Sequence, residues 1–339
     1  MNTINIKKNI KKYLVFNKNK IKINSKDIIK NDVFLSLQGK NSHGNNYINE
    51  AIKKGAKYII TDSKKNLPKN LKNILFVKST LDFVSKIAVE KRKIYNGKII
   101  AITGSVGKTT VKEYLKFFLS FSKKIFASIK SYNNHLGVLI SLTNLDLKSN
   151  FAVFEIGTSN FNEIRKLTSI IKPEQTIITS IQPTHLLNFR NTRNVAIEKS
   201  DIFNSKINRN LKLVILPNSN KDEFFLIKKA SKNKKLKVLK FGHKINSDFR
   251  ILENIKLNEK FSKIKVAFQK NLFQFKINSL QESQIFNVIM VMIIFKYNNI
   301  SLKRFFDKTK FLPKIEGRGA EKIININKKK ITIIDESYN

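Results

Sequence analysis

Hydrophobic residues gather in short continuous runs along the chain, and these runs alternate with longer segments of helical pattern. The strongest runs are Lys98 to Thr103, Phe151 to Ile156, Thr176 to Ile181 and Leu211 to Leu216. A run that is apolar on both faces predicts a strand of a parallel sheet covered on both sides. The intervening patterns predict helices over residues 109–121, 163–171 and 194–203. The sequence therefore predicts an α/β fold with a mainly parallel sheet.

The first 95 residues predict a separate, smaller α/β unit. Strands are expected at 33–37 and 57–60, and helices at 47–54 and 81–94. Asn96-Gly97 is a turn sequence and marks the boundary of this unit.

The later part of the chain changes its pattern. Short alternating segments over 238–277 predict antiparallel ribbons, and helices follow at 282–297 and 301–308. Pro313, Gly317 and Gly319 mark a second boundary, beyond which 323–326 and 331–334 predict paired strands. We thus expect domains over 1–95, 96–312 and 313–339.

A candidate phosphate-binding loop follows the predicted strand at 98–103 and opens the helix after it. Its residues are Gly104, Ser105, Val106, Gly107, Lys108, Thr109 and Thr110. The glycines allow backbone N–H groups to turn around an anion, and the helix N-terminus adds partial positive charge. Lys108 can reach the terminal phosphates of a nucleotide, and the Thr109 hydroxyl can bind Mg²⁺. This context predicts that the chain binds the phosphates of a nucleotide together with Mg²⁺.

Composition and charge leave two interpretations open. Lys and Arg outnumber Asp and Glu by 66 to 24, a formal net charge of +42, which fits a nucleic-acid-binding protein. Most of these cations are Lys, however, whereas base recognition favours the planar fork of Arg. Lys, Asn, Ile and Phe share AT-rich codons, so we attribute most of the charge to codon bias. The absence of Cys excludes a disulfide scaffold and a thiolate zinc site.

Several motifs together resemble the Mur ligase family, the ATP-dependent amide-forming enzymes of peptidoglycan precursor synthesis, and its relative folylpolyglutamate synthase. The compact loop T-G-x-x-G-K-T-T is the first of them. The others follow in the family's order: SYNNHLG at 131–137, FEIG at 154–157, TSIQPTHLLNF at 179–189, EKSDIF at 198–203, GRG at 317–319 and DESYN at 335–339. The resemblance implies an N-terminal UDP-binding domain, a central P-loop ATPase domain and a C-terminal Rossmann-like domain that is almost entirely missing here.

The resemblance also implies roles for individual residues. Lys108, Lys199 and His185 correspond to catalytic positions, and Lys199 aligns with a lysine that is carbamylated in several members. Mg²⁺ would be held by Thr109 and Glu155, and a second Mg²⁺ by His185.

Further binding positions also follow from the resemblance. ATP binding would involve the phosphate loop together with Asn287, the last residue of SQIFN, and Arg318. The corresponding substrate-binding residues are Ser25, Gln38, Gly39, Asn133 and Asn134.

The final residues, DESYN, are similar to a motif of the family member that acts on UDP-N-acetylmuramoyl-tripeptide and D-alanyl-D-alanine. The resemblance implies that these two compounds are the substrates and that the reaction passes through an acyl phosphate. Another Mur ligase, or a folylpolyglutamate synthase, is the alternative within the same class.

The remaining expectations concern the state of the chain. Because it ends where the family's third domain begins, we expect a fragment or truncated product with little ligase activity alone. We also expect a cytoplasmic monomer without a specific nucleic-acid partner. The longest apolar run, Val288 to Phe295, is too short for membrane insertion.

Overall fold

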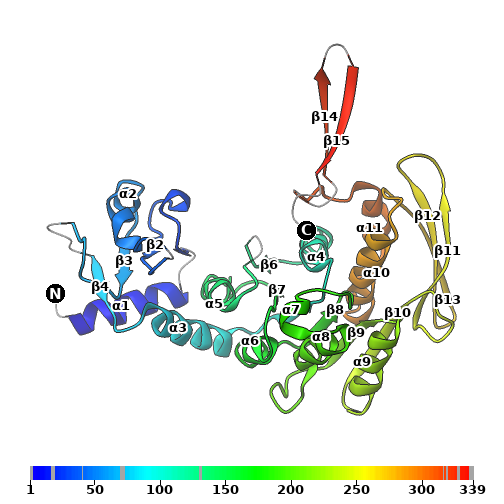
Figure 1. Cartoon of the computed structure of the whole chain (residues 1–339), viewed down its shortest axis with the longest axis horizontal. Coiled ribbons are helices and arrows are strands. Elements are labelled where there is room, and N and C mark those ends of the chain that lie inside the picture. Colours follow the sequence, from blue (N-terminus) through cyan, green and yellow to red (C-terminus); the bar gives the residue numbers. More distant parts are fainter. Residues whose placement is uncertain are drawn as a thin grey trace. The chain divides into compact units, whose positions relative to one another are not determined.

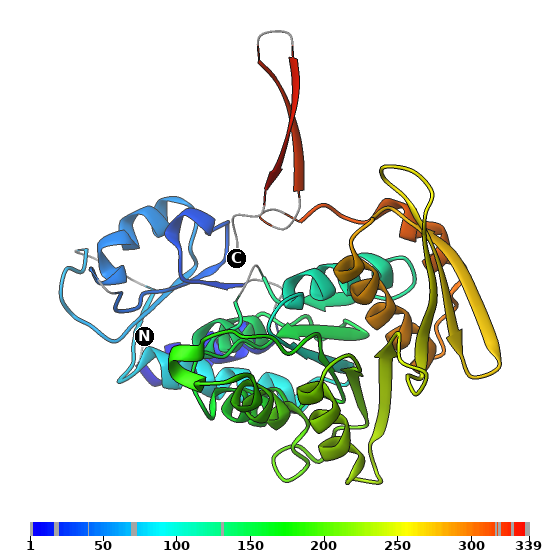
Figure 2. The same cartoon turned by 45° about the vertical axis from the view of Figure 1, so that its right-hand side comes forward.

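The computed structural model describes residues 3–16, 20–39, 41–68, 73–129, 132–315, 317, 320–326 and 329–335. The chain forms two compact units (Figures 1 and 2). One contains residues 1–97 and 132–149, and the other contains 98–131 and 150–339. Within the described ranges, no helix combines the length and apolar character needed to cross a membrane.

The first unit is built on a four-stranded parallel sheet in the order β1-β2-β3-β4. The strands are β1 (Ile21–Lys22), β2 (Val33–Leu35), β3 (Tyr58–Thr61) and β4 (Ile74–Phe76). The helices are α1 (Thr3–Phe16), α2 (Ile48–Lys53), α3 (Thr80–Ile94) and α5 (His135–Thr143). A small apolar core joins β2, β3 and α2 through Phe34, Ile48, Ala51 and Ile59.

Residues 132–149 pack with the first unit, although the sequence interpretation placed them in the range 96–312. Lys91 on α3 donates from Nζ to the carbonyl oxygen of Thr143 at 2.7 Å. Asn144 exchanges two hydrogen bonds with the backbone of Ile21, at 2.8 and 2.9 Å. These contacts join residues more than fifty positions apart, so no local pattern reveals them. The division into functional domains at 95 and 312 stays a prediction.

The second unit contains a nine-stranded sheet in the order β13-β12-β11-β10-β9-β8-β5-β7-β6. Its first strands are β5 (Lys98–Thr103), β6 (Ile125–Ala127), β7 (Phe151–Glu155), β8 (Gln175–Ile178) and β9 (Leu213–Pro217). β10 (Lys237–Gly242), β11 (Phe249–Lys256), β12 (Ser262–Phe268) and β13 (Asn271–Ile277) follow. Neighbours from β6 through to β11 pair in parallel, which confirms the predicted α/β fold with a mainly parallel sheet.

The predicted antiparallel ribbons over 238–277 are wrong at their beginning. β10 pairs in parallel with both β9 and β11, and only the β11–β12 and β12–β13 pairs are antiparallel. For the β9–β10 pair the reason is α9 (Lys221–Ser231), a crossover helix that the hydrophobic pattern did not predict. Asn220 and Glu223 form a capping box at its start. A crossover helix returns the next strand parallel to the one before it.

The remaining helices of the second unit are α4 (Lys108–Ser120), α6 (Glu163–Ile171), α7 (Leu186–Phe189), α8 (Thr192–Ser200), α10 (Glu282–Tyr297) and α11 (Lys303–Lys308). α4 and α10 lie side by side and share the main apolar core of this unit (Figures 1 and 2). The strands predicted near the end form the antiparallel pair β14 (Ala320–Ile326) and β15 (Lys329–Asp335).

Candidate functional site

The candidate site lies where the carboxyl ends of three neighbouring strands meet. β5 pairs in parallel with β7 on one side and with β8 on the other. The connection after β5 leads to β6 on the β7 side, whereas the connection after β7 leads to β8 on the opposite side. Ligands of open parallel sheets bind at such a switch point, at the carboxyl ends of the strands.

The phosphate loop joins β5 to α4 and requires glycine at two positions. Gly104 has a φ of +147° and Gly107 a φ of +89°, a backbone region that favours glycine. A Cβ atom at Gly104 would lie 1.9 Å from Oγ1 of Thr179, which follows β8. Gly107 is the N-cap of α4 and leaves its first-turn N–H groups without a side-chain cap. This arrangement suits an anion placed at the helix N-terminus.

Hydrogen bonds from the segment after β8 fix the shape of this loop. The N–H of Ser105 donates to the carbonyl of Ser180 at 3.0 Å, and the N–H of Val106 donates to the Ser180 hydroxyl at 3.2 Å. The Thr179 hydroxyl donates to the carbonyl of Val106. Gln182 and Ser105 exchange two hydrogen bonds, at 2.9 and 3.0 Å. The loop is therefore held in a preformed shape.

Two lysine side chains converge on one carbonyl oxygen of the loop. Nζ of Lys108 lies 2.9 Å from the Gly104 oxygen, and Nζ of Lys199, on α8, lies 3.1 Å from the same atom. Burial, helped by the charge of Lys108 and opposed by Glu198, lowers the pKa of Lys199 to about 7. The sequence-predicted pair is thus brought together, with Lys199 partly neutral near pH 7.

Thr109 and Glu155 form the part of the site that suits Mg²⁺. The Thr109 hydroxyl donates to Oε2 of Glu155 at 2.8 Å, and both side chains are buried. Hard oxygen ligands of this kind fit Mg²⁺, which takes one or two protein ligands and completes its shell with phosphate and water. Among the residues that the structure describes, no three His, Asp or Glu side chains gather into a metal site supplied by the protein alone.

His185 lies at the edge of this region rather than inside it. Its side chain is exposed, and its φ of +54° starts the short helix α7. The preceding residue, Thr184, places its hydroxyl 3.3 Å from the Ser105 hydroxyl. The structure therefore puts His185 on a segment that touches the loop, and its role as a metal ligand stays a prediction.

A cavity of about 330 Å³ opens beside the loop and reaches α10. Asn287 on this helix is buried, and a Cβ atom at Gly107 would lie 3.0 Å from its Oδ1. The lining includes Val106, Gly107, Thr110, Thr179, Ser180, Asn220, Gln284 and Asn287. The position of Asn287 is thus compatible with its predicted contact to a bound nucleotide.

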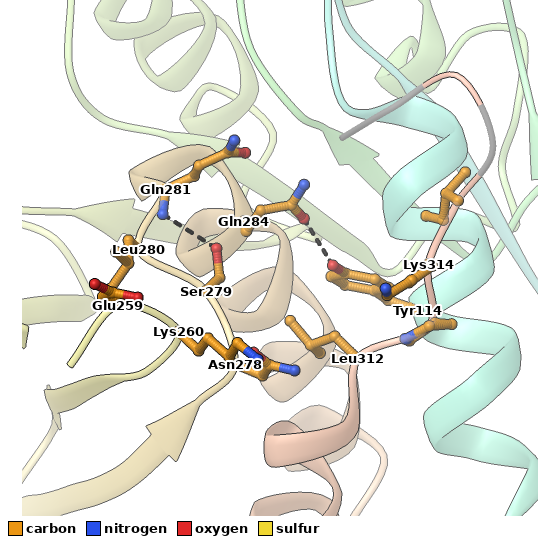
Figure 3. A pocket seen from close by; sticks show the side chains of 12 residues that line it. Tyr114, Glu259, Lys260, Asn278, Ser279, Leu280, Gln281, Gln284, Leu312 and Lys314 are labelled. Carbon is orange, nitrogen blue, oxygen red and sulfur yellow. Dashed lines mark hydrogen bonds between the residues drawn. The ribbon is translucent and has the colours of Figure 1, made fainter. Parts of the chain in front are cut away.

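A second cavity, of about 400 Å³, also opens at the start of α10 (Figure 3). Gln281 and Gln284 line both cavities. The hydroxyl of Tyr114, on α4, donates to Oε1 of Gln284 at 2.7 Å. Burial raises the pKa of Tyr114, so this hydroxyl stays protonated. The bond ties the helix of the phosphate loop to the helix that carries Asn287.

The predicted substrate residues all lie in the first unit, and several are engaged in local bonds. The Ser25 hydroxyl donates to Oε2 of Glu50 at 2.6 Å, and the Asn134 side chain caps α5 by accepting from the N–H of Gly137 at 2.8 Å. Gln38 and Gly39 form an exposed loop after β2. Asn133 directly precedes the capping residue. Arg318 and residues 336–339 lie outside the described residues.

Sequence reasoning missed residues that hold the phosphate loop from outside or line the cavity beside it. Thr179 and Ser180 were assigned to the strand 176–181, although β8 ends at Ile178. Asn220 was missed together with α9, although it follows the end of β9. Polar residues directly after predicted parallel strands were the available signal, because strand carboxyl ends meet at one edge.

The chain matches known proteins over most of its length. Residues 102–295 match the model of the Mur ligase middle domain, and residues 19–97 match the model of the Mur ligase family catalytic domain. A UDP-N-acetylmuramoyl-tripeptide–D-alanyl-D-alanine ligase of Rickettsia prowazekii is 32% identical over 95% of this chain and 70% of its own length. The ligase of the same name from Buchnera aphidicola subsp. Baizongia pistaciae is 31% identical, over 91% of this chain and 65% of its own length.

Solved structures share this fold. The MurF ligase of Thermotoga maritima, solved in complex with ADP, superposes with a TM-score of 0.76 at 24% identity, covering 96% of this chain and 72% of that one. A folylpolyglutamate synthase from the same organism reaches only 0.54 at 14% identity, covering 74% of this chain and 66% of that one. The resemblance deduced from the motifs is confirmed, and the chain belongs to the Mur ligase family.

Proposed function

We propose that this protein is an ATP-dependent ligase that forms the amide bond between UDP-N-acetylmuramoyl-tripeptide and D-alanyl-D-alanine. The observation that carries the proposal is the phosphate loop with its buried Thr109–Glu155 pair, in a Mur ligase chain whose curated relatives bear the name of this ligase. The folylpolyglutamate synthase alternative is not favoured, because its structural match is much weaker. The nucleic-acid-binding alternative rests on net charge alone.

The site residues divide the proposed reaction between them. Thr109 and Glu155 would hold Mg²⁺, which supplies positive charge at the β- and γ-phosphates. Lys108 would stabilise the γ-phosphoryl group as it moves to the terminal carboxylate of the tripeptide. The amine of D-alanyl-D-alanine then attacks the acyl phosphate, the amide bond forms, and inorganic phosphate leaves with a proton lost from the amine.

The other predicted residues have supporting roles in this proposal. Asn287 and Arg318 would contact the nucleotide, and His185 would bind a second Mg²⁺ near the carboxylate. Residues of the first unit, Ser25, Gln38, Gly39, Asn133 and Asn134, would bind the UDP-sugar peptide. We also propose that the protein is cytoplasmic and monomeric.

The test measures two steps with the unmodified protein as produced in its cell: formation of the acyl phosphate and formation of the amide product. Acyl-phosphate formation is trapped with hydroxylamine in the presence of ATP, Mg²⁺ and UDP-N-acetylmuramoyl-tripeptide. We expect the trapped product without D-alanyl-D-alanine, and UDP-N-acetylmuramoyl-pentapeptide with it. Trapping with folate in place of the UDP-sugar peptide, or no nucleotide-dependent product at all, would overturn the proposal.

Lys199 gives a separate prediction, namely that its amine carries a carbamate. Only the neutral amine attacks CO₂, forming an N–C bond and releasing one proton, and a pKa of about 7 makes the neutral form abundant. We expect carbamate formation to increase as pH rises through about 7 at constant dissolved CO₂. The measurement is the ¹³C NMR carbamate signal in ¹³C-bicarbonate.

The matched variants for this measurement are Lys199→Met and Lys166→Met. Lys166 is an exposed lysine on α6. The signal should disappear in the first variant and stay in the second. A signal that survives in Lys199→Met, or its absence from the unmodified protein above pH 8, contradicts the prediction.

A further inference from the structure

Lys112 is a buried cation that the proposed reaction does not use. It lies on α4, one turn after Lys108, and its side chain is 0% exposed. Nζ donates to the carbonyl oxygen of Ser128 at 3.0 Å and lies 3.1 Å from Oε1 of Glu113. Burying an ammonium group costs free energy, and an apolar side chain of similar volume is often as stable or more stable there. Stability alone therefore does not favour a lysine at this position.

Ser128 connects this lysine to the end of β7. It directly follows β6, and its N–H donates to the carbonyl of Val153 on β7 at 3.0 Å. Its hydroxyl accepts a hydrogen bond from the N–H of Glu155 at 3.4 Å. One side chain thus contacts the backbone of the residue whose carboxylate is the candidate Mg²⁺ ligand.

The contacts close into a ring that begins and ends on α4. Lys112 bonds Ser128, Ser128 bonds the backbone of Glu155, and Oε2 of Glu155 accepts from the Thr109 hydroxyl at 2.8 Å. Thr109 and Lys112 are three residues apart, so they project from neighbouring positions of one helix. The ring fixes the ends of β6 and β7 against the first turn of α4.

We propose that Lys112 is a positioning residue that sets the geometry of the Thr109–Glu155 pair, and with it the affinity for Mg²⁺ in the nucleotide complex. The inference rests on the proposed function, because it takes this pair as the Mg²⁺ site. Lys112 acts through Ser128 and does not itself touch the nucleotide. Outer contacts of this kind orient metal ligands, and their loss costs affinity.

The first test replaces Lys112 with Met, an unbranched side chain that is one heavy atom shorter and carries no charge. Binding of the non-hydrolysable analogue β,γ-imido-ATP is measured by calorimetry at a series of Mg²⁺ concentrations. We expect the Mg²⁺ concentration for half-maximal binding to rise about tenfold, with a much smaller change in binding without Mg²⁺. Lys116→Met is the control, because Lys116 lies one turn further along α4 and is exposed.

A second variant tests the same proposal if Lys112→Met folds poorly. Ser128→Ala removes the hydroxyl that accepts from Glu155 and keeps the carbonyl that accepts from Lys112. We expect the same shift in Mg²⁺ dependence, and the double variant should show less than the sum of the two effects, since both break one path. Lower thermal stability with unchanged Mg²⁺ dependence in both variants means that Lys112 is only structural, and the inference fails.

The outcome for the unmodified protein separates this inference from the proposed function. If the unmodified chain shows no Mg²⁺-dependent binding of the analogue, the proposed function itself fails. If it does, and Ser128→Ala and Lys112→Met both behave like Lys116→Met, only the role of Lys112 fails.

Discussion

Replacing Gly104 with Ala is expected to lower nucleotide affinity by about 100-fold, through backbone strain of 1–3 kcal/mol and a steric clash. At φ +147° an Ala residue is strained, and its Cβ would lie 1.9 Å from Oγ1 of Thr179. The loop must therefore move away from the segment after β8, which holds it in shape. Equilibrium binding of β,γ-imido-ATP with Mg²⁺ measures the effect.

Two further variants show where this loss comes from. Thr179→Ala removes the oxygen at 1.9 Å but keeps the Thr179 backbone nitrogen, which would lie 2.9 Å from the new Cβ. The double variant Gly104→Ala/Thr179→Ala should therefore regain only part of the affinity, and the rest stays lost to backbone strain and this close contact. Circular dichroism and thermal unfolding check that the sheet is intact. Nucleotide affinity within about twofold of the unmodified protein in Gly104→Ala would show that the loop does not bind phosphate in the described shape.

Replacing Lys108 with Met is expected to slow acyl-phosphate formation by about 10²- to 10³-fold, the usual effect of removing one charge-stabilising group from a reacting centre. Nζ of Lys108 lies 2.9 Å from the Gly104 oxygen and 3.1 Å from the Ser105 oxygen, at the mouth of the loop. Its charge acts on the phosphoryl group as that group moves, so the rate should fall much more than nucleotide affinity does. Hydroxylamine trapping gives the rate, and calorimetry gives the affinity.

Lys116→Met is again the matched control, because it removes the same charge from an exposed position on the same helix. Its rate should equal that of the unmodified protein. Lys108→Arg tests the shape of the cation, since the planar guanidinium fork does not reproduce a compact ammonium. Equal losses of rate and affinity in Lys108→Met would assign Lys108 to ground-state binding instead of catalysis.

The local part of the fold was predictable because its signals are local. The boundaries of β5 and α6 agree with the sequence pattern. A parallel strand covered on both faces forms a continuous apolar run, and an amphipathic helix has its own period. The helix α9 was missed because its apolar positions are mixed with lysines, and this omission made β10 look like part of an antiparallel ribbon. One missing helix thus changed the expected direction of a strand.

The residues of the phosphate loop were predictable from the sequence, but the residues that hold the loop in place were not. A strand, two glycines, a lysine and a threonine in fixed order identify the phosphate loop without any structure. No local sequence pattern indicates that Thr179 packs against Gly104. Nor does any local pattern indicate that Lys199 and Lys108 bond the same carbonyl oxygen. Those pairs are separated by more than seventy residues, and only the strand order brings them together.

The sequence by itself therefore determined the fold class, the family and the residues of the phosphate loop, because each depends on short-range periodicity or on motifs in a fixed order. The tertiary structure alone decided which surroundings these residues have. Burial beside a second cation lowers the pKa of Lys199 to about 7. Packing of α4 against β6 and β7 makes Lys112 a buried contact rather than one more surface lysine. Burial and electrostatics arise from atoms far apart in the chain, which is why the sequence could name the residues but not their states.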